Sequence, residues 1–234
     1  MRQFVIGDVH GCNVSLHALL KQLDLTTEDE LYFLGDYIDR GPDSKGVFDT
    51  IFNLRGAGHK VECLLGNHEA MLLGALGGNR QDEFDWKKHG GKQTLQSFKI
   101  WEFYDFPRAY PDFMAEMPLF WEVGDYILVH GGLNFNQTDP LKQTQQMIWI
   151  RDWYDKINYK WLGNRIILHG HTPQTIAETT AQLAVLEQDR VLNLDCGCVF
   201  NKSLYNTLAC FELQSRQLYF QKNVEISVST DDEW

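Results

Sequence analysis

Short apolar runs alternate with helically spaced apolar residues in the first third of the chain. The runs at 4–6, 31–34 and 61–65 predict buried strands, each ending close to a glycine. Two helices are predicted between them: Leu16, Leu19, Leu20 and Leu23 recur at helical spacing, and a helix over about 44–54 places its apolar residues on one face. The order strand, helix, strand, helix, strand indicates an α/β fold.

The segment from about 79 to 118 has a different composition. It is rich in aromatic and charged residues and lacks a clear strand pattern. We interpret it as a helical insertion beside the core. The aromatic residues expected to form the core of this insertion are Trp86, Trp101, Phe103, Tyr104, Phe106 and Tyr110.

Further strands are predicted in the second half of the chain, at 126–129, 165–168, 191–194, 208–213 and 218–220. The polar, acidic tail at about 227–234 is expected to be loose. No repeat or linker-like stretch interrupts the sequence, so we expect one domain over 1–234.

Charge and cysteine usage exclude several classes of protein. The net charge is −11 and no basic run occurs, which argues against nucleic acid as a partner. We find no signal-peptide pattern and no apolar run long enough to span a bilayer, so no membrane partner and a cytoplasmic location are expected. Five cysteines without framework spacing argue against a disulfide scaffold.

Polar residues follow many of the predicted strands directly. They are Asp8-Val9-His10, Asp36, Asn67-His68, His130 and His169-Gly170-His171. In open α/β sheets, ligands bind beyond the carboxyl ends of the strands. We therefore expect these side chains to gather at one site.

These residue types are metal ligands. Carboxylate, imidazole and amide oxygen together suit Mn²⁺ and also Fe or Zn²⁺, and Asp36 could bridge two cations held about 3.5–4 Å apart. Arg40, in the loop after Asp36, and Arg151 fit as clamps for phosphate, because guanidinium groups match phosphate oxygens in bidentate geometry.

Five ordered segments resemble the signature of a known family. They are Gly7-Asp8-Val9-His10-Gly11, Gly35-Asp36-Tyr37-Ile38-Asp39-Arg40-Gly41, Gly66-Asn67-His68-Glu69, His130-Gly131-Gly132 and Gly170-His171-Thr172. The set is similar to that of the phosphoprotein phosphatases within the calcineurin-like metallophosphoesterases, and in particular to small bacterial and bacteriophage serine/threonine phosphatases. The resemblance implies a β-sandwich of two mixed sheets flanked by helices.

The resemblance also implies roles for individual residues. Asp8, His10 and Asp36 would bind one divalent metal ion, most simply Mn²⁺. The ligands of the second ion would be Asp36, Asn67, His130 and His171. A metal-bridging hydroxide would attack phosphorus directly. Arg40, Arg151 and Asn67 would hold the phosphoryl oxygens, and His68, supported by Asp39, would protonate the leaving group.

Other residues near these motifs have a structural interpretation. His169 precedes the Gly-His motif, and ligation by His171 is favoured over ligation by His169. Cys12 and Cys196 are interpreted as small buried residues, because no separate histidine is free to activate a thiol.

Two enzymatic functions compete. The main hypothesis is a phosphomonoesterase acting on phosphoserine and phosphothreonine in proteins, with phosphotyrosine as a further substrate. The alternative is a symmetrical dinucleoside tetraphosphatase, whose anhydride substrate needs no strong acid. Asp39 favours the first, since the resembling tetraphosphatases usually lack an aspartate there. A non-catalytic binding module is disfavoured, because no ligand position is missing.

Overall fold

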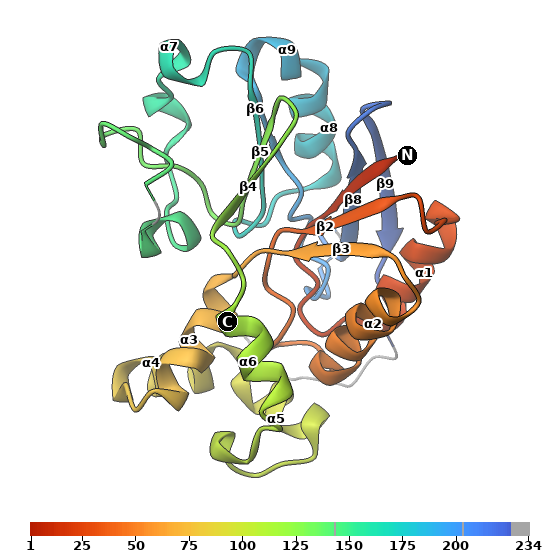
Figure 1. The fold of residues 1–234 in the computed structure, drawn as a ribbon, viewed down its shortest axis with the longest axis vertical. Helices are drawn as coiled ribbons and strands as arrows, with labels where there is room; N and C mark the ends of the chain where they lie inside the picture. The colour runs from red at the N-terminus through yellow and green to blue at the C-terminus, as the bar shows by residue number, and fades with distance from the viewer. Residues whose placement is uncertain (143, 203, 226–234) are drawn as a thin grey trace.

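The computed structural model describes residues 1–142, 144–202 and 204–225, and two mixed β-sheets form its centre (Figure 1). The first sheet has the order β3-β2-β1-β8-β9. β1 (Gln3–Ile6), β2 (Glu30–Phe33) and β3 (Lys60–Cys63) are parallel, whereas β8 (Thr207–Glu212) and β9 (Gln217–Lys222) continue the sheet with antiparallel pairing. These strands confirm the predicted strand positions to within a few residues.

The second sheet has the order β4-β5-β6-β7. β5 (Tyr126–Val129), β6 (Ile166–His169) and β7 (Val191–Asn193) are parallel, and β4 (Phe120–Val123) pairs antiparallel with β5. Together the two mixed sheets and their helices confirm the predicted fold class.

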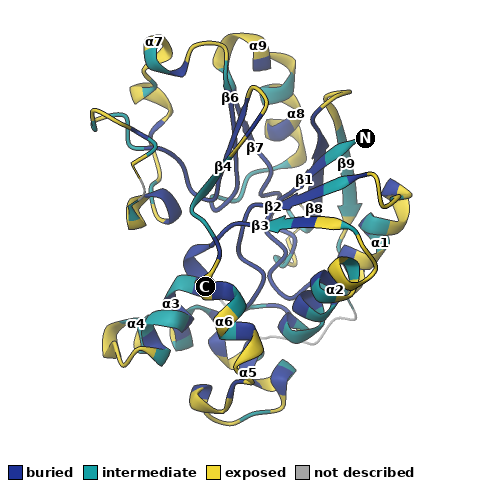
Figure 2. Ribbon diagram, viewed as in Figure 1, coloured by how far each residue is buried: buried dark blue, intermediate teal, exposed yellow. Residues whose placement is uncertain are grey.

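Apolar side chains from both sheets share one buried cluster. Val5 in the first sheet and Leu34, directly after β2, meet Leu128, Leu168 and Leu192 from the second. Burial of this apolar area contributes about 25 cal/mol per Å². On its outer face the first sheet is covered by α1 (Asn13–Leu23) and α2 (Ser44–Gly56), and the strands form the buried centre of the molecule (Figure 2).

The predicted insertion is helical. It contains α4 (Arg80–Trp86), a π-helical turn (Lys87–Gly91), α5 (Lys92–Phe98), a 3₁₀ turn (Phe103–Asp105) and α6 (Ala109–Ala115). The predicted aromatic core is correct for Trp86, Phe103, Phe106 and Tyr110, which are buried. It is wrong for Trp101 and Tyr104, which are 91% and 67% exposed, because they lie on the solvent side of the turn after α5.

Several elements have no counterpart in the sequence-based expectation. They are α3 (Asn67–Leu76), β4, α7 (Tyr159–Leu162), α8 (Ile176–Ala184), α9 (Leu186–Asp189) and the 3₁₀ turns Gln145–Ile148 and Tyr154–Lys156. β4 is a four-residue strand at the sheet edge with two half-buried residues, one exposed and one buried, so its alternation is weak. The predicted loose tail at 227–234 lies outside the described residues. Within the part of the chain that the structure describes, no helix is both long and apolar enough to cross a bilayer.

Candidate metal centre

The polar residues singled out from the sequence converge where parallel strands of both sheets end. Asp8 follows β1, Asp36 follows β2 and Asn67 begins α3 after β3. From the second sheet, His130 follows β5 and His171 follows β6. All are buried, as is His10. The sequence therefore predicted the gathering correctly, although Asn67 and His68 lie in the first turn of a helix instead of a loop.

Asp36 lies at the middle of this group. Its Oδ2 is 3.4 Å from Nε2 of His10, and its Oδ1 is 3.3 Å from Nε2 of His130. On the other side, Oδ1 of Asn67 lies 3.0 Å from Nε2 of His130 and 2.8 Å from Nδ1 of His171. One carboxylate thus faces both halves of the cluster.

The compact groups of donors differ in one residue from the set that the resemblance implies. One group is Asp36, His130 and His171, and the other is His10, Asp36 and His68, with donor atoms within 4.8 Å of one another. His68 stands in the second group where Asp8 was expected. The Asp8 carboxylate instead accepts a hydrogen bond from the backbone N of His171 at 3.0 Å.

Backbone carbonyls orient two of the imidazole rings. Nδ1 of His10 donates to the carbonyl of Ile38 at 2.8 Å, and Nδ1 of His130 donates to that of Leu34 at 2.9 Å. A neutral ring that donates from Nδ1 has its lone pair on Nε2. The lone pair of His130 therefore faces the oxygens of Asp36 and Asn67, so three acceptor atoms converge there. Such an arrangement fits a cation.

The electrostatics agree with that fit. Burial lowers the pKa of His10 and of His130, and it lowers the pKa of His171 to about 2, so the rings are neutral at pH 7, the form that can bind a cation. Burial, followed by the neighbouring carboxylates of Asp195 and Asp36, raises the pKa of Asp8. A cation would relieve this repulsion, because it favours the ionised carboxylates. Nε2 of His171 is buried with no partner among the described residues.

Several of the non-glycine residues with positive φ lie at the same site. His10, Asp36, Asp39, Arg40 and His171 have φ values of 46°, 53°, 73°, 67° and 69°. A positive φ costs a non-glycine residue on the order of 1–3 kcal/mol. It persists only where the surrounding structure holds the backbone in that conformation. Gly35, at φ 117°, leaves room for the second sheet, because a Cβ there would lie 2.7 Å from Nδ1 of His130.

Glu69 holds the strained loop after β2. Its buried carboxylate accepts hydrogen bonds from the backbone N of Asp36 at 3.0 Å and of Tyr37 at 2.9 Å, and from Gly66 in a capping box on α3. Sequence reasoning gave this residue no role. The available signal was a glutamate three residues after Gly66, at the start of a helix.

His68 and Asp39 form a buried pair beside the cluster. Nδ1 of His68 lies 2.6 Å from Oδ2 of Asp39, and Nε2 of His68 points toward Asp36 at 4.0 Å. Burial raises the pKa of Asp39, although its hydrogen bond to His68 acts in the opposite direction. The pair has the geometry of an imidazole whose orientation is fixed by a carboxylate.

The two arginines lie on different sides of the centre. Arg40 is half-buried, donates to Nε2 of His10 at 2.6 Å and has its guanidinium over the ring of Phe200. Arg151 is exposed and donates to Oγ1 of Thr172 at 3.0 Å. Both are close enough to Asp195 to lower its pKa, which burial nevertheless raises to about 6. Asp195 thus joins the acidic side of the centre.

His169 is turned to other partners. Its Nε2 is hydrogen-bonded to the hydroxyl of Tyr154, and its ring packs against Trp153 with centroids 5.3 Å apart. These contacts fit the preference for His171 over His169 as a ligand. All five cysteines are buried and free, in agreement with the interpretation of Cys12 and Cys196.

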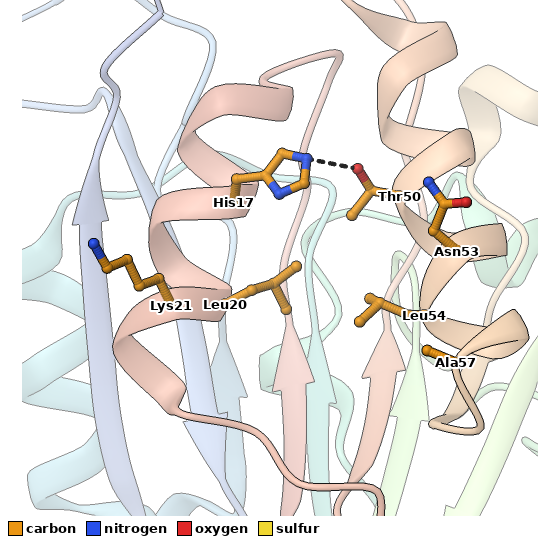
Figure 3. A pocket seen from close by; sticks show the side chains of 7 residues that line it. All are labelled: His17, Leu20, Lys21, Thr50, Asn53, Leu54 and Ala57. Carbon is orange, nitrogen blue, oxygen red and sulfur yellow. Dashed lines mark hydrogen bonds between the residues drawn. The ribbon is translucent and has the colours of Figure 1, made fainter.

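Cavities lined by the described residues include one beside the centre and one between two helices. One has a volume of about 510 Å³ and adjoins the centre, since the ring of Trp149 on its wall is 6.4 Å from that of His171. It is lined by Leu65, Ala70, Met71, Leu73, Gly74, Asp82, Gln145 and Trp149. The other, of about 390 Å³, lies between α1 and α2, and Figure 3 shows His17 hydrogen-bonded to Thr50 on its wall. None of the predicted site residues lines either cavity, and the first cavity adjoins the centre through Trp149.

Comparisons with known proteins agree with this arrangement. The sequence model of the calcineurin-like phosphoesterases matches residues 1–209. A symmetrical bis(5'-nucleosyl)-tetraphosphatase from Nitrosomonas europaea is 31% identical over 169 residues, which is 70% of this chain and 58% of that protein. The enzyme of the same name from Vibrio cholerae is 31% identical over 57% of this chain and 45% of its own length. The chain therefore spans about half the length of these relatives.

Solved structures share the fold at low sequence identity. A protein described provisionally as a diadenosine tetraphosphatase superposes with a TM-score of 0.67 at 18% identity, covering 96% of this chain and 94% of the other. A serine/threonine phosphatase from Saccharomyces cerevisiae gives a TM-score of 0.64 at 15% identity, covering 97% and 82%. These likenesses concern the fold alone.

Proposed function

The chain belongs to the calcineurin-like phosphoesterase family, whose members are metal-dependent hydrolases, and we propose that it cleaves dinucleoside tetraphosphates symmetrically. This substrate class is the one that the names of the sequence relatives state. It corresponds to the alternative that Asp39 disfavoured at the level of sequence. Water would add to a phosphorus atom and the bridging oxygen would leave, so that two nucleoside diphosphates are formed.

The observation that carries the proposal is the position of the 510 Å³ cavity beside the convergent acceptors. Trp149 is 45% exposed on its wall, and the guanidinium of Arg151 lies two residues further on. An exposed aromatic face can stack a nucleobase, which is worth about 1–3 kcal/mol per base. Gln145 and Asp82 supply polar groups for the edge of that base.

The proposed ligands follow from the contacts around Asp36. Asp8, His10 and Asp36 would hold one divalent cation, and Asp36, Asn67, His130 and His171 the other. Bound cations supply Lewis-acid charge and lower the pKa of a water molecule toward neutrality. In the compact donor groups, His68 stands where Asp8 was expected. Of the six proposed ligands, Asp8 therefore has the weakest support from the geometry.

The remaining residues would act on the phosphate chain. Arg40 lies beside His10 and Arg151 beside His171, and both would neutralise phosphoryl oxygens, together with the amide of Asn67. His68 would donate a proton to the departing oxygen, and Asp39 would hold the ring with Nδ1–H toward itself. For an anhydride this proton contributes little, because a nucleoside diphosphate is already a good leaving group.

The His68–Asp39 pair favours a second candidate. A phosphomonoesterase for phosphoserine or phosphothreonine must protonate an alkoxide, and the buried 2.6 Å contact between these side chains provides such an acid. A protein phosphatase among the structural neighbours has the same fold. That likeness does not bear on which substrate this chain cleaves.

Parallel assays with Mn²⁺ distinguish the two candidates. Diadenosine tetraphosphate should be converted to two molecules of ADP much faster than a phosphoserine peptide releases phosphate. Cleavage to ATP and AMP would contradict the symmetrical assignment. Faster turnover of the peptide, with a larger loss in His68→Asn on the peptide than on p-nitrophenyl phosphate, would replace the first candidate by the second.

A further inference from the structure

The second oxygen of the Asp39 carboxylate is bound by the helical insertion. While Oδ2 faces His68, Oδ1 accepts a hydrogen bond from the indole Nε1–H of Trp86 at 2.9 Å and another from the hydroxyl of Thr94 at 2.6 Å. Trp86 ends α4 and Thr94 lies in α5, about 50 residues along the chain from Asp39. All four side chains are buried.

The same segment also holds the backbone of this loop. Oγ1 of Thr94 accepts a hydrogen bond from the backbone N of Asp39 at 2.8 Å, and the hydroxyl of Ser44 lies 3.0 Å from it. Thr94 therefore contacts Asp39 twice, once as a donor and once as an acceptor. Asp39 itself has φ 73°, a conformation that requires such support.

Two glycines allow the insertion to come this close. The π-helical turn between α4 and α5 contains Gly90 at φ 113°, and the backbone N of Arg40 contacts the carbonyl of Gly90 at 3.4 Å. A Cβ at Gly90 would lie 2.5 Å from that nitrogen, and one at Gly91 would lie 2.6 Å from the indole of Trp86. The kink thus fits between Arg40 and Trp86.

We propose that the segment 86–94 is a positioning element, in which Trp86 and Thr94 hold the Asp39 carboxylate so that its free oxygen faces His68. Without these two donors a carboxylate can rotate about its Cβ–Cγ bond and lose its contact with the imidazole. The insertion, interpreted from sequence only as packing, then contributes to the proton-donating pair. The kinetic consequence rests on the proposed hydrolase function, whereas the contact itself does not.

Conservative changes separate positioning from packing. Thr94→Val removes the hydroxyl and keeps the shape, Thr94→Ser keeps the hydroxyl, and Trp86→Phe removes the N–H. Phe103→Leu is the packing control, because Phe103 is buried against Trp86 and has a ring that cannot donate to Asp39. Each variant would be assayed with phenyl phosphate, a poor leaving group, and p-nitrophenyl phosphate, a good one.

We expect Thr94→Val and Trp86→Phe to lose at least about 10-fold more kcat on phenyl phosphate than on p-nitrophenyl phosphate, since a general acid contributes about 10²–10⁴-fold in all. KM should stay unchanged. In Thr94→Ser the ratio of kcat on phenyl phosphate to kcat on p-nitrophenyl phosphate should return to the wild-type value. Equal losses on both esters, or the same ratio in Phe103→Leu, would overturn the proposal.

A spectroscopic readout tests the contact without activity. The indole ¹H–¹⁵N resonance of Trp86, assigned from its absence in Trp86→Phe, should move upfield in Asp39→Asn, because the hydrogen bond to a charged oxygen is lost. An indole chemical shift that is the same in Asp39→Asn as in the wild type would refute the positioning role. If the wild type cleaves neither diadenosine tetraphosphate nor a phosphate ester while the resonance shifts as expected, the proposed function fails and the positioning contact stands.

Discussion

Asp36 contacts both halves of the donor cluster, with His10 and His68 on one oxygen and His130 on the other. Asp36→Asn should therefore weaken both metal ions and reduce activity by more than about 100-fold, since loss of an outer-shell partner alone costs about 10–100-fold. Metal content after dialysis against Mn²⁺ measures the first effect. Retention of two metal ions by the variant would show that Asp36 is not a ligand of both.

The arginines should differ in their effect on phosphate. Arg40 is half-buried at the cluster, whereas Arg151 is exposed and more strongly screened by solvent. A charge-assisted hydrogen bond is worth about 1.5–3 kcal/mol. Arg40→Ala should raise the inhibition constant of inorganic phosphate by about 10–100-fold and Arg151→Ala by less, both with normal metal content. Unchanged inhibition by inorganic phosphate in both variants would show that neither arginine binds phosphate.

Trp149 should affect nucleotide substrates selectively. Trp149→Ala removes the exposed face on the cavity wall, and we expect KM for diadenosine tetraphosphate to rise by about 5–100-fold, in line with the loss of a stacked base. KM for p-nitrophenyl phosphate should not change. Trp101→Ala is the matched control, because Trp101 is also exposed and does not line that cavity. A similar rise in both variants would argue against a base site at Trp149.

At the scale of elements, an ion pair ties the beginning of β1 to the loop before β2. The Asp29 carboxylate accepts hydrogen bonds from Nη2 of Arg2 at 2.6 Å and from the backbone N of Thr26 at 2.9 Å. The hydrogen bond from Arg2 is the main cause that lowers the pKa of Asp29 below its ordinary value of 3.8. The unfolded chain therefore takes up this proton more readily than the folded one.

The sign of the resulting pH dependence follows directly. The stabilisation of the folded state by the Arg2–Asp29 ion pair is fully present above about pH 4 and is lost as the pH falls further. Asp29→Asn should lower the free energy of unfolding by about 1–2 kcal/mol at pH 7, because Arg2 is partly exposed. Urea unfolding at pH 7, 5 and 3 should show the gap to wild type narrowing only below pH 4. Glu28→Gln, at an exposed neighbour, is the control, and a pH-independent gap would exclude the ion pair as the cause.

At the scale of the whole molecule, the candidate centre joins the two sheets. Asp8, Asp36 and Asn67 follow strands of the first sheet, and His130 and His171 follow strands of the second. Bound cations would therefore stabilise the packing between the sheets. A ligand at 100 times its Kd adds about 2.7 kcal/mol per site, which corresponds to about 5–10 °C in Tm for a chain of this length.

Thermal unfolding with and without Mn²⁺ checks this expectation. Tm should rise on addition of Mn²⁺ and return after EDTA. Asp36→Asn should show little of the rise, whereas the Glu28→Gln control should show all of it. An equal rise in Asp36→Asn would place the stabilising ions elsewhere.

The sequence by itself determined the elements whose signal is local. Buried strands such as 4–6 and 126–129 are short apolar runs, and helix α1 shows regular leucine spacing, so neither depends on distant residues for recognition. The convergence of Asp8 and Asp36 also followed, because both follow parallel strands of one sheet, whose carboxyl ends lie at one edge. His130 follows a strand of the second sheet, and the packing of the two sheets brings it to them. The position of Asp8 and Asp36 at strand ends was therefore sufficient to predict a common site for these two residues.

Only the tertiary structure decided which atoms meet within that site. The position of Asn67 between two imidazoles, the place of His68 in a donor group and the contact of Trp86 with Asp39 each join segments that are distant in the chain. Exposure of Trp101 and the pairing of β4 with β5 were decided in the same way. Periodicity reports which face of an element is buried, whereas the partner on that face depends on how separate elements pack, and no local pattern encodes that choice.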